Sequence, residues 1–265
     1  MTLDVDARRV PDGAGSADRV SAWIARHWLF VFNLGMALFV GGTLLAPVLM
    51  YAGLEGPARA VYTFYGLNCH QLPERSYFLF GPNGIDSYSL EHVLAWGADP
   101  GYLRGFVGNG EVGFKMAMAQ RNTAIYSTLL VAGLAYAVVR RRVRPLPARA
   151  FALLILPMVL DGFSHVASEV TGLAFRDSNA WLAALTGHAL PAAFYTGTTL
   201  GSFNWLMRTL TGALFALACA WFAFPRVPRA FSDALHGADG APARARPRPA
   251  AGSWSPHNAG DTERT

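Results

Sequence analysis

The sequence predicts an all-α fold, a polytopic membrane helix bundle with about four transmembrane helices and a long outer loop that carries interfacial helices. Of the 265 residues, 52% are hydrophobic and only 15% are charged, whereas a soluble domain usually carries about 25% charged residues. Four apolar segments approach or exceed the roughly 20 residues that cross about 30 Å of hydrocarbon. The arginines gather in segments outside these spans, which is typical of membrane topology.

The segments divide the chain into three parts. Residues 1–27 form a cytoplasmic tail with an amphipathic lead-in, residues 28–225 form the membrane domain, and residues 226–265 form a basic disordered cytoplasmic tail. That last assignment follows from a composition rich in Pro, Ala, Arg and Gly without hydrophobic periodicity. Within the membrane domain we expect spans at about 28–51, 123–139, 150–173 and 205–224, with outer loops at 52–122 and 174–204.

Arginine placement predicts the orientation. The short connection 140–149 is strongly basic, and both tails also carry several arginines. Positive segments of this kind remain on the cytoplasmic side, so we expect a multi-pass protein of the cell inner (plasma) membrane with both termini cytoplasmic. The outer loop 52–122 is too long for an idle connector. Its aromatic, Gly and Pro content predicts interfacial helices, for example Ala58–Leu67 and Leu90–Trp96.

The third predicted span carries a polar stripe. Asp161, His165 and Glu169 follow at steps of four, so they share one face of a helix. Each charged group at such depth costs about 2.5–3.5 kcal/mol on insertion scales, and such groups usually face a bundle interior or a wet cavity. We therefore expect a polar site on this face, with Asp161 and Glu169 as candidate catalytic carboxylates.

A second candidate feature is the pair Cys69-His70 in the outer loop. A thiol beside an imidazole can ligate zinc or another borderline metal, and a Cys–His pair can also supply a thiolate nucleophile. The predicted topology puts this pair and His165 on the same side of the membrane. Cys69, His70 and His165 are accordingly candidate ligands for a divalent metal such as zinc, with Glu169 as a general base beside a metal-bound water.

Arginines offer a different interpretation of the same stripe. Arg75, Arg121 and Arg208 lie in or near the outer side of the predicted bundle. They could neutralise Asp161 and Glu169 in a buried polar network, or snorkel singly to the headgroups. Arginines directed at the stripe could instead bind an anionic group such as a lipid phosphate through forked hydrogen bonds. The sequence leaves the metal site, the polar network and the anion site open.

Several short motifs resemble domain-of-unknown-function family 2085, a group of uncharacterised prokaryotic membrane proteins. They are Cys69-His70-Gln71-Leu72-Pro73-Glu74-Arg75-Ser76, Arg121 to Tyr126, Asp161-Gly162, and Asn204 with Arg208, Thr211 and Gly212. The resemblance implies the same membrane architecture and the same location of the site. Family members often carry a Cys-x-Arg-Cys type pattern before the second span, where this chain has Ala119-Gln120-Arg121-Asn122. If those thiols complete a metal site, part of it is lost here, and His165 could compensate.

The function expected from these features is metal-dependent chemistry, or metal or anion handling, at the outer leaflet. The alternatives are a small transporter and a non-catalytic subunit of a larger membrane complex. Expected partners are the lipid bilayer, anionic lipid headgroups, and a second copy or another membrane protein. No nucleic acid is expected, since the basic residues follow membrane topology.

Overall fold

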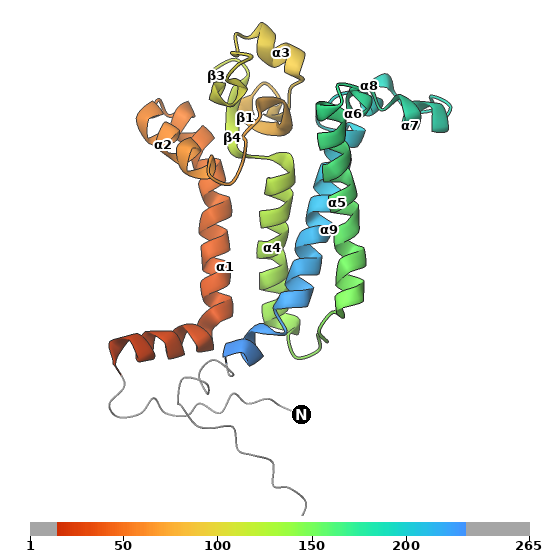
Figure 1. Cartoon of the computed structure of the whole chain (residues 1–265). Coiled ribbons are helices and arrows are strands. Elements are labelled where there is room, and N and C mark those ends of the chain that lie inside the picture. Colours follow the sequence, from red (N-terminus) through yellow and green to blue (C-terminus); the bar gives the residue numbers. More distant parts are fainter. Residues whose placement is uncertain (1–14, 232–265) are drawn as a thin grey trace, which may run out of the picture.

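The structure is a computed structural model that describes residues 15–231. Its framework is a set of four long helices, α1 (Ser16–Tyr51), α4 (Gln120–Val139), α5 (Ala148–Val170) and α9 (Phe203–Ala223) (Figure 1). All four are long and apolar enough to cross a membrane, as predicted. Helix α9 packs against both α4 and α5, while α1 contacts α4. The tail segments 1–14 and 232–265 lie outside the described residues, and with them most of the predicted disordered tail.

Helix α1 bends at His27, whose backbone leaves the helical region at φ −111° and ψ 17°. The part before the bend lies across the lower end of the bundle in Figure 1. The imidazole of His27 stacks on Trp23 with a centroid separation of 4.7 Å. The bend thus coincides with the position where the predicted amphipathic lead-in ends and the predicted first span begins.

The prediction of an all-α fold was wrong in the long loop. That loop contains a four-stranded antiparallel sheet of order β2-β1-β4-β3. Its strands are β1 (Ser76–Gly81), β2 (Gly84–Asp86), β3 (Gly108–Asn109) and β4 (Gly113–Ala119). The physical reason is a hairpin signal: Asn83-Gly84 follows an aromatic run, and Gly84 takes the positive φ of 84° that such a turn requires.

Short helices complete both predicted outer loops. Helices α2 (Glu55–Tyr65) and α3 (Leu90–Ala95) lie close to the two expected interfacial helices. The remaining short elements are the 3₁₀ turns Pro73–Arg75 and Leu103–Gly105, and helices α6 (Phe175–Ser178), α7 (Ala180–Leu185) and α8 (Ala192–Tyr195). All of these share one end of the bundle with β1–β4 (Figure 1). We call it the sheet end.

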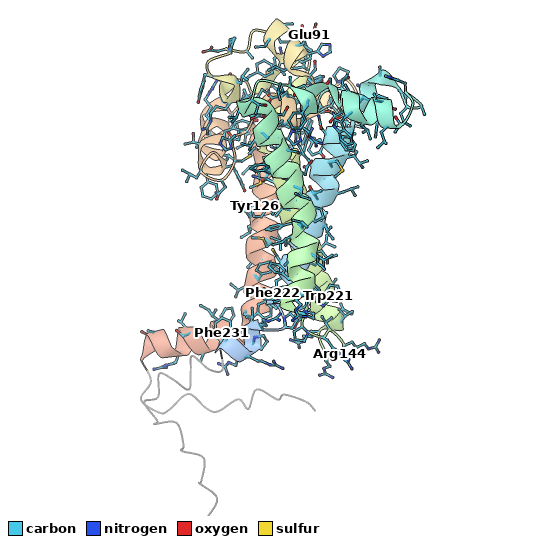
Figure 2. All side chains as sticks on the ribbon, turned by 45° about the vertical axis from the view of Figure 1, so that its right-hand side comes forward. Glu91, Tyr126, Arg144, Trp221, Phe222 and Phe231 are labelled. Carbon is cyan, nitrogen blue, oxygen red and sulfur yellow. The ribbon has the colours of Figure 1, made fainter. Side chains whose placement is uncertain are left out.

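The opposite end carries the basic connection 140–147, and we call it the arginine-loop end. Figure 2 shows the two ends clearly, with Glu91 at the tip of one and Arg144 at the other. Trp221 and Phe222 of α9 lie near Arg144 there, and the Trp221 indole N–H donates to the Arg144 carbonyl at 2.9 Å. The two predicted outer loops therefore share one end, and the basic connection lies at the other.

An apolar core joins the sheet to α1 and α2. It consists of Ala46, Met50, Ala58, Tyr62, Tyr65, Ala117 and Met118. The Tyr65 hydroxyl donates to the Phe39 carbonyl at 2.6 Å. That hydroxyl occupies the space beside Gly42, where an added Cβ would lie 2.2 Å from the oxygen. Apolar packing thus holds the sheet on top of α1, and the Tyr65 hydroxyl ties α2 to α1.

Lys115, in the middle of β4, is the single lysine of the chain and has an exposed fraction of 0%. Its ammonium donates to the carbonyls of Gln71 and Arg104, each at 2.9 Å. Burial lowers the pKa of Lys115 from 10.5 to about 7; the Cys69 and Glu74 charges oppose this shift, and Arg104 adds to it. The ammonium therefore ties two loops to the sheet.

This burial predicts a pH-dependent stability of the sheet end. Because the folded-state pKa is lowered, the unfolded chain holds more protons than the folded chain between pH values of about 7 and 10.5. Stability should therefore rise with pH across that window. We expect the thermal unfolding midpoint of wild type to rise from about pH 7 to about pH 9 relative to Lys115→Met. Parallel midpoint curves for the two proteins would contradict the assignment.

Candidate functional site

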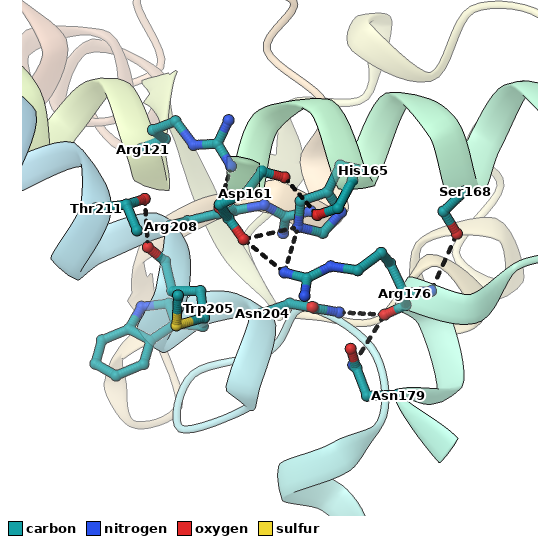
Figure 3. Close-up of polar contacts among 12 residues, drawn as sticks. Arg121, Asp161, His165, Ser168, Arg176, Asn179, Asn204, Trp205, Arg208 and Thr211 are labelled. Carbon is teal, nitrogen blue, oxygen red and sulfur yellow. Dashed lines mark hydrogen bonds and ion pairs between the residues drawn. The ribbon is translucent and has the colours of Figure 1, made fainter. Parts of the chain in front are cut away.

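Asp161 lies at the centre of a buried group of charges at the sheet end (Figure 3). It stands on α5 and is 5% exposed. Its Oδ2 accepts a hydrogen bond from Arg121 Nη2 at 2.5 Å, and its Oδ1 accepts one from Arg176 Nη2 at 2.6 Å. Arg121 lies in the first turn of α4, and Arg176 belongs to α6. One carboxylate therefore connects three elements.

The α5 face is arranged in part as its periodicity predicted. Asp161 and His165 are buried together with Ser168, and Phe163 and Val166 on the opposite face are exposed. Glu169, the third member of the predicted stripe, is exposed. A helix with one polar face in a membrane bundle buries that face against its neighbours. The polar stripe is therefore directed into the bundle, and the apolar face is the one left for lipid.

His165 lies one turn beyond Asp161 between two guanidinium groups. Its Nε2 is 3.1 Å from Arg176 Nη2, and its Nδ1 is 3.5 Å from Arg208 Nη2. A neutral imidazole accepts a hydrogen bond at only one of its nitrogens. We assign the acceptor to Nε2 because the Arg176 contact is the shorter one. The Nδ1–H of His165 then faces a donor on Arg208, so this contact is not a hydrogen bond.

Arg208 is consequently a buried cation without a counterion. It is 4% exposed on α9, and its Nη1 has no hydrogen-bond partner. Among residues 15–231, no carboxylate lies within ion-pair distance of its guanidinium. The charges of Arg75 and Arg121 also act on it unfavourably, and those of Asp161 and Glu74 act on it favourably. An uncompensated buried charge costs several kcal/mol.

The backbone around Arg176 is fixed by amides and a hydroxyl. Its N–H donates to Ser168 Oγ at 3.0 Å, and its carbonyl accepts from the amides of Asn204 at 2.6 Å and Asn179 at 2.9 Å. Its guanidinium also lies over the Phe203 ring at 5.3 Å. These contacts turn the chain after α5 back over the helix and place Arg176 above Asp161.

Arg176 was missed from the sequence. It lies in the predicted outer loop 174–204, where a charged Arg-Asp pair in a largely apolar segment is a weak signal. Burial lowers the pKa of Arg176; the Asp161 charge opposes this effect and the Arg121 charge adds to it. Four arginines therefore surround Asp161 and His165. We call Arg75, Arg121, Arg176 and Arg208 the arginine cluster.

Two glycines shape the space around Arg121. A Cβ on Gly162 of α5 would lie 3.3 Å from Arg121 Nη1, and a Cβ on Gly212 of α9 would lie 3.1 Å from its carbonyl oxygen. Both distances are tighter than ordinary van der Waals contact. The arginine thus passes between two helices that approach it closely.

Arg75 and Glu169 form the rim of the site. Arg75 Nη2 donates to Glu169 Oε1, and Arg75 Nε lies 3.5 Å from Glu74 Oε1. The Arg75 and Glu169 side chains are 29% and 54% exposed. Of the pairs that the sequence suggested for a polar network, Arg121 with Asp161 and Arg75 with Glu169 are present. Arg208 pairs with neither carboxylate.

The predicted metal ligands do not form a common set. Cys69 is buried, and its Sγ accepts from the backbone N–H groups of Gln71 and Ala119, each at 3.4 Å. His70 is exposed and lines a hollow of about 260 Å³ with residues 100–104 and Leu72. In the part of the chain from 15 to 231, no group of three or more His, Cys, Asp or Glu side chains is placed to hold a metal.

The structure does not bring Cys69, His70 and His165 into one ligand set. Neighbouring residues in an extended segment point to opposite sides, so the Cys69 thiol turns into the sheet and the His70 ring turns out. His165 is enclosed by guanidinium groups instead. Residues on the same side of a membrane need not lie close enough together to bind one metal ion.

A comparison with known families supports the membrane assignment. Residues 111–222 match the family described as "Predicted membrane protein (DUF2085)". The matched interval includes Arg121, Asp161, His165, Arg176 and Arg208, but not Cys69, His70 or Arg75. No curated protein and no solved structure matches the chain significantly. The family match and the four apolar helices together support a membrane protein that is similar to DUF2085 over residues 111–222.

Proposed function

We propose that the arginine cluster binds an anionic group, a phosphate or a carboxylate, at the sheet end. The observation that carries the proposal is Arg208, which is buried without a counterion and has an unpartnered Nη1. A bound anion would supply the missing charge, and a guanidinium matches the oxygens of phosphate and carboxylate in a forked geometry. The proposal includes the predicted orientation, with the sheet end outside an inner membrane and both termini cytoplasmic.

Charge balance supports this assignment. Arg75, Arg121, Arg176 and Arg208 are opposed by Glu74, Asp161 and Glu169. With His165 neutral, the group retains an excess positive charge. Inside a low-dielectric bundle such an excess favours occupation by an anion, because the attraction is little screened. The ligand oxygens would be received by Arg208 Nη1 and by the Nδ1–H of His165.

The carboxylates then have positioning roles. Asp161 holds Arg121 and Arg176 by one oxygen each. Glu169 holds Arg75 at the exposed rim. Their acidic oxygens are engaged by arginine, which argues for fixing the cluster rather than for the general-base role predicted for Glu169. Enzyme, transporter and complex subunit remain compatible with this binding step, and turnover or flux in liposomes would distinguish them.

Calorimetric titration of the detergent-solubilised protein tests the proposal. The probes are inorganic phosphate and short-chain phosphatidic acid. Arg208→Gln should bind the effective probe about ten-fold or more weakly, since a charge-assisted hydrogen bond contributes about 1.5–3 kcal/mol. Binding of inorganic phosphate would identify a small anion as sufficient, and binding of phosphatidic acid alone would identify a lipid.

The matched control is Arg59→Gln. Arg59 also lies at the sheet end, but it is exposed on α2 and pairs only with Glu55 at 3.5 Å among the described side chains. It should bind like wild type. Equal binding by Arg208→Gln and wild type would refute the anion site, and no heat with either probe would refute a phosphate ligand.

A further inference from the structure

A groove lies between α1 and α4 at the arginine-loop end, on the far side of the bundle from the arginine cluster. Its volume is about 650 Å³, within the range of roughly 300–1,000 Å³ typical of ligand pockets. The walls are apolar side chains of both helices, namely Leu29, Phe30, Leu34, Ala37, Leu130, Leu134 and Ala137. The α1 wall extends for about 12 Å at 1.5 Å per residue, which is long enough for much of an acyl chain.

The mouth of the groove is cationic. Arg26 and Arg140 line it together with His27 and Trp28. Arg26 lies just before the bend in α1, and Arg140 directly follows α4, so two separate elements each bring one arginine to the same opening. Both are exposed, and among residues 15–231 no carboxylate forms an ion pair with either.

We infer that this groove binds a single anionic phospholipid, with one acyl chain along the apolar walls and the phosphate between Arg26 and Arg140. Charge complementarity selects the occupant. The apolar tail of a lipid matches the apolar walls of the groove, and its phosphate matches the two arginines at the mouth. A second copy of the chain or another apolar helix would cover the walls but leave both guanidiniums without an anion.

Two further features of the groove favour a lipid. Trp28 at the mouth packs on Phe224 with centroids 5.7 Å apart, and tryptophan is enriched at the level of lipid headgroups. Asn33 also lines the groove, with its Oδ1 unpartnered against Gly133. An amide at this depth can donate to the ester carbonyl of a lipid. The inference is independent of the anion site, because the two sites use different residues at opposite ends.

Native mass spectrometry of the delipidated protein tests the inference. Phosphatidylglycerol and phosphatidylcholine are titrated in separate samples. Wild type should retain a single phosphatidylglycerol and little phosphatidylcholine. The double substitution Arg26→Gln with Arg140→Gln should lower phosphatidylglycerol retention about ten-fold or more, since each basic residue contributes on the order of a few-fold near an anionic lipid.

Two controls separate the groove from general charge. Arg141→Gln with Arg142→Gln makes the same charge change beside Arg140, at positions that do not line the groove, and should bind like wild type. Ala37→Trp fills the groove without changing charge and should also lose the lipid. Equal retention in the two arginine variants, equal retention of the two lipids, or a lipid-free dimer as the only complex would overturn the inference.

Discussion

Asp161→Asn is expected to destabilise the helix bundle by about 3–5 kcal/mol, the cost of breaking a buried ion pair from one side. The substitution keeps the shape of the side chain but removes the charge that Arg121 and Arg176 share at 2.5 and 2.6 Å. Arg176 would then join Arg208 as a buried cation without a counterion, and the half-buried Arg121 would lose its carboxylate partner. The midpoint of denaturant unfolding in detergent, followed by circular dichroism, measures the effect.

Asp177→Asn is the matched control for this substitution. Asp177 follows Arg176 directly but is exposed, and no described side chain forms an ion pair with it. We expect its free energy of unfolding to differ from that of wild type by no more than about 0.5 kcal/mol, as for other surface substitutions. Combining Asp161→Asn with Arg176→Gln should recover part of the lost stability, because the two groups are coupled. An Asp161→Asn protein as stable as Asp177→Asn would contradict the central role of Asp161.

Arg208→Met, in contrast to Asp161→Asn, should stabilise the protein. We expect its free energy of unfolding without a bound anion to rise by about 1–4 kcal/mol. Replacing a buried charge by an apolar side chain of similar volume removes its desolvation cost. Arg208 has no carboxylate partner among the described residues to lose. The same variant should show no further stabilisation when phosphate or phosphatidic acid is added, whereas wild type should gain stability from the ligand. Unfolding midpoints with and without the probe measure both effects.

Arg121→Met provides the contrast. It removes an arginine from the same cluster, but one that contacts a carboxylate, so it should destabilise the protein and leave the Asp161 charge short of a partner. Stability changes of opposite sign in the two variants would distinguish Arg208, as a ligand-binding residue, from Arg121, as a structural one. If Arg208→Met destabilised the anion-free protein as much as Arg121→Met, Arg208 would be part of the scaffold.

The four long helices and the buried face of α5 were predictable because apolar length and a 3.6-residue period are local properties of the sequence. The sheet was not predicted, since aromatic residues beside Gly and Pro suit interfacial helices as well as short strands. The Asn83-Gly84 pair was the available local signal for the hairpin. Residues 110–112 join β3 to β4, and Gly113 at the start of β4 has a φ of 80°, which is another turn signature.

The site was predicted in part. Asp161, Arg121 and His165 could be placed near one another from helix faces and topology. Arg176 could not, because its position depends on a hydrogen bond from Asn204, which lies 28 residues further along the chain, as well as on one from the nearby Asn179. The metal hypothesis for Cys69 and His70 relied on a shared side of the membrane. That is a statement about topology, and it sets no distance between side chains.

The two glycines that flank Arg121 have a consequence for affinity. A long arginine side chain ordinarily loses about 1.5–2 kcal/mol of rotamer freedom when it is immobilised. Here the close approach of Gly162 and Gly212 confines Arg121, and its tip is held by Asp161 at 2.5 Å before any solute arrives. The entropic penalty is met during folding, so the scaffold beside Arg208 is already ordered when an anion arrives.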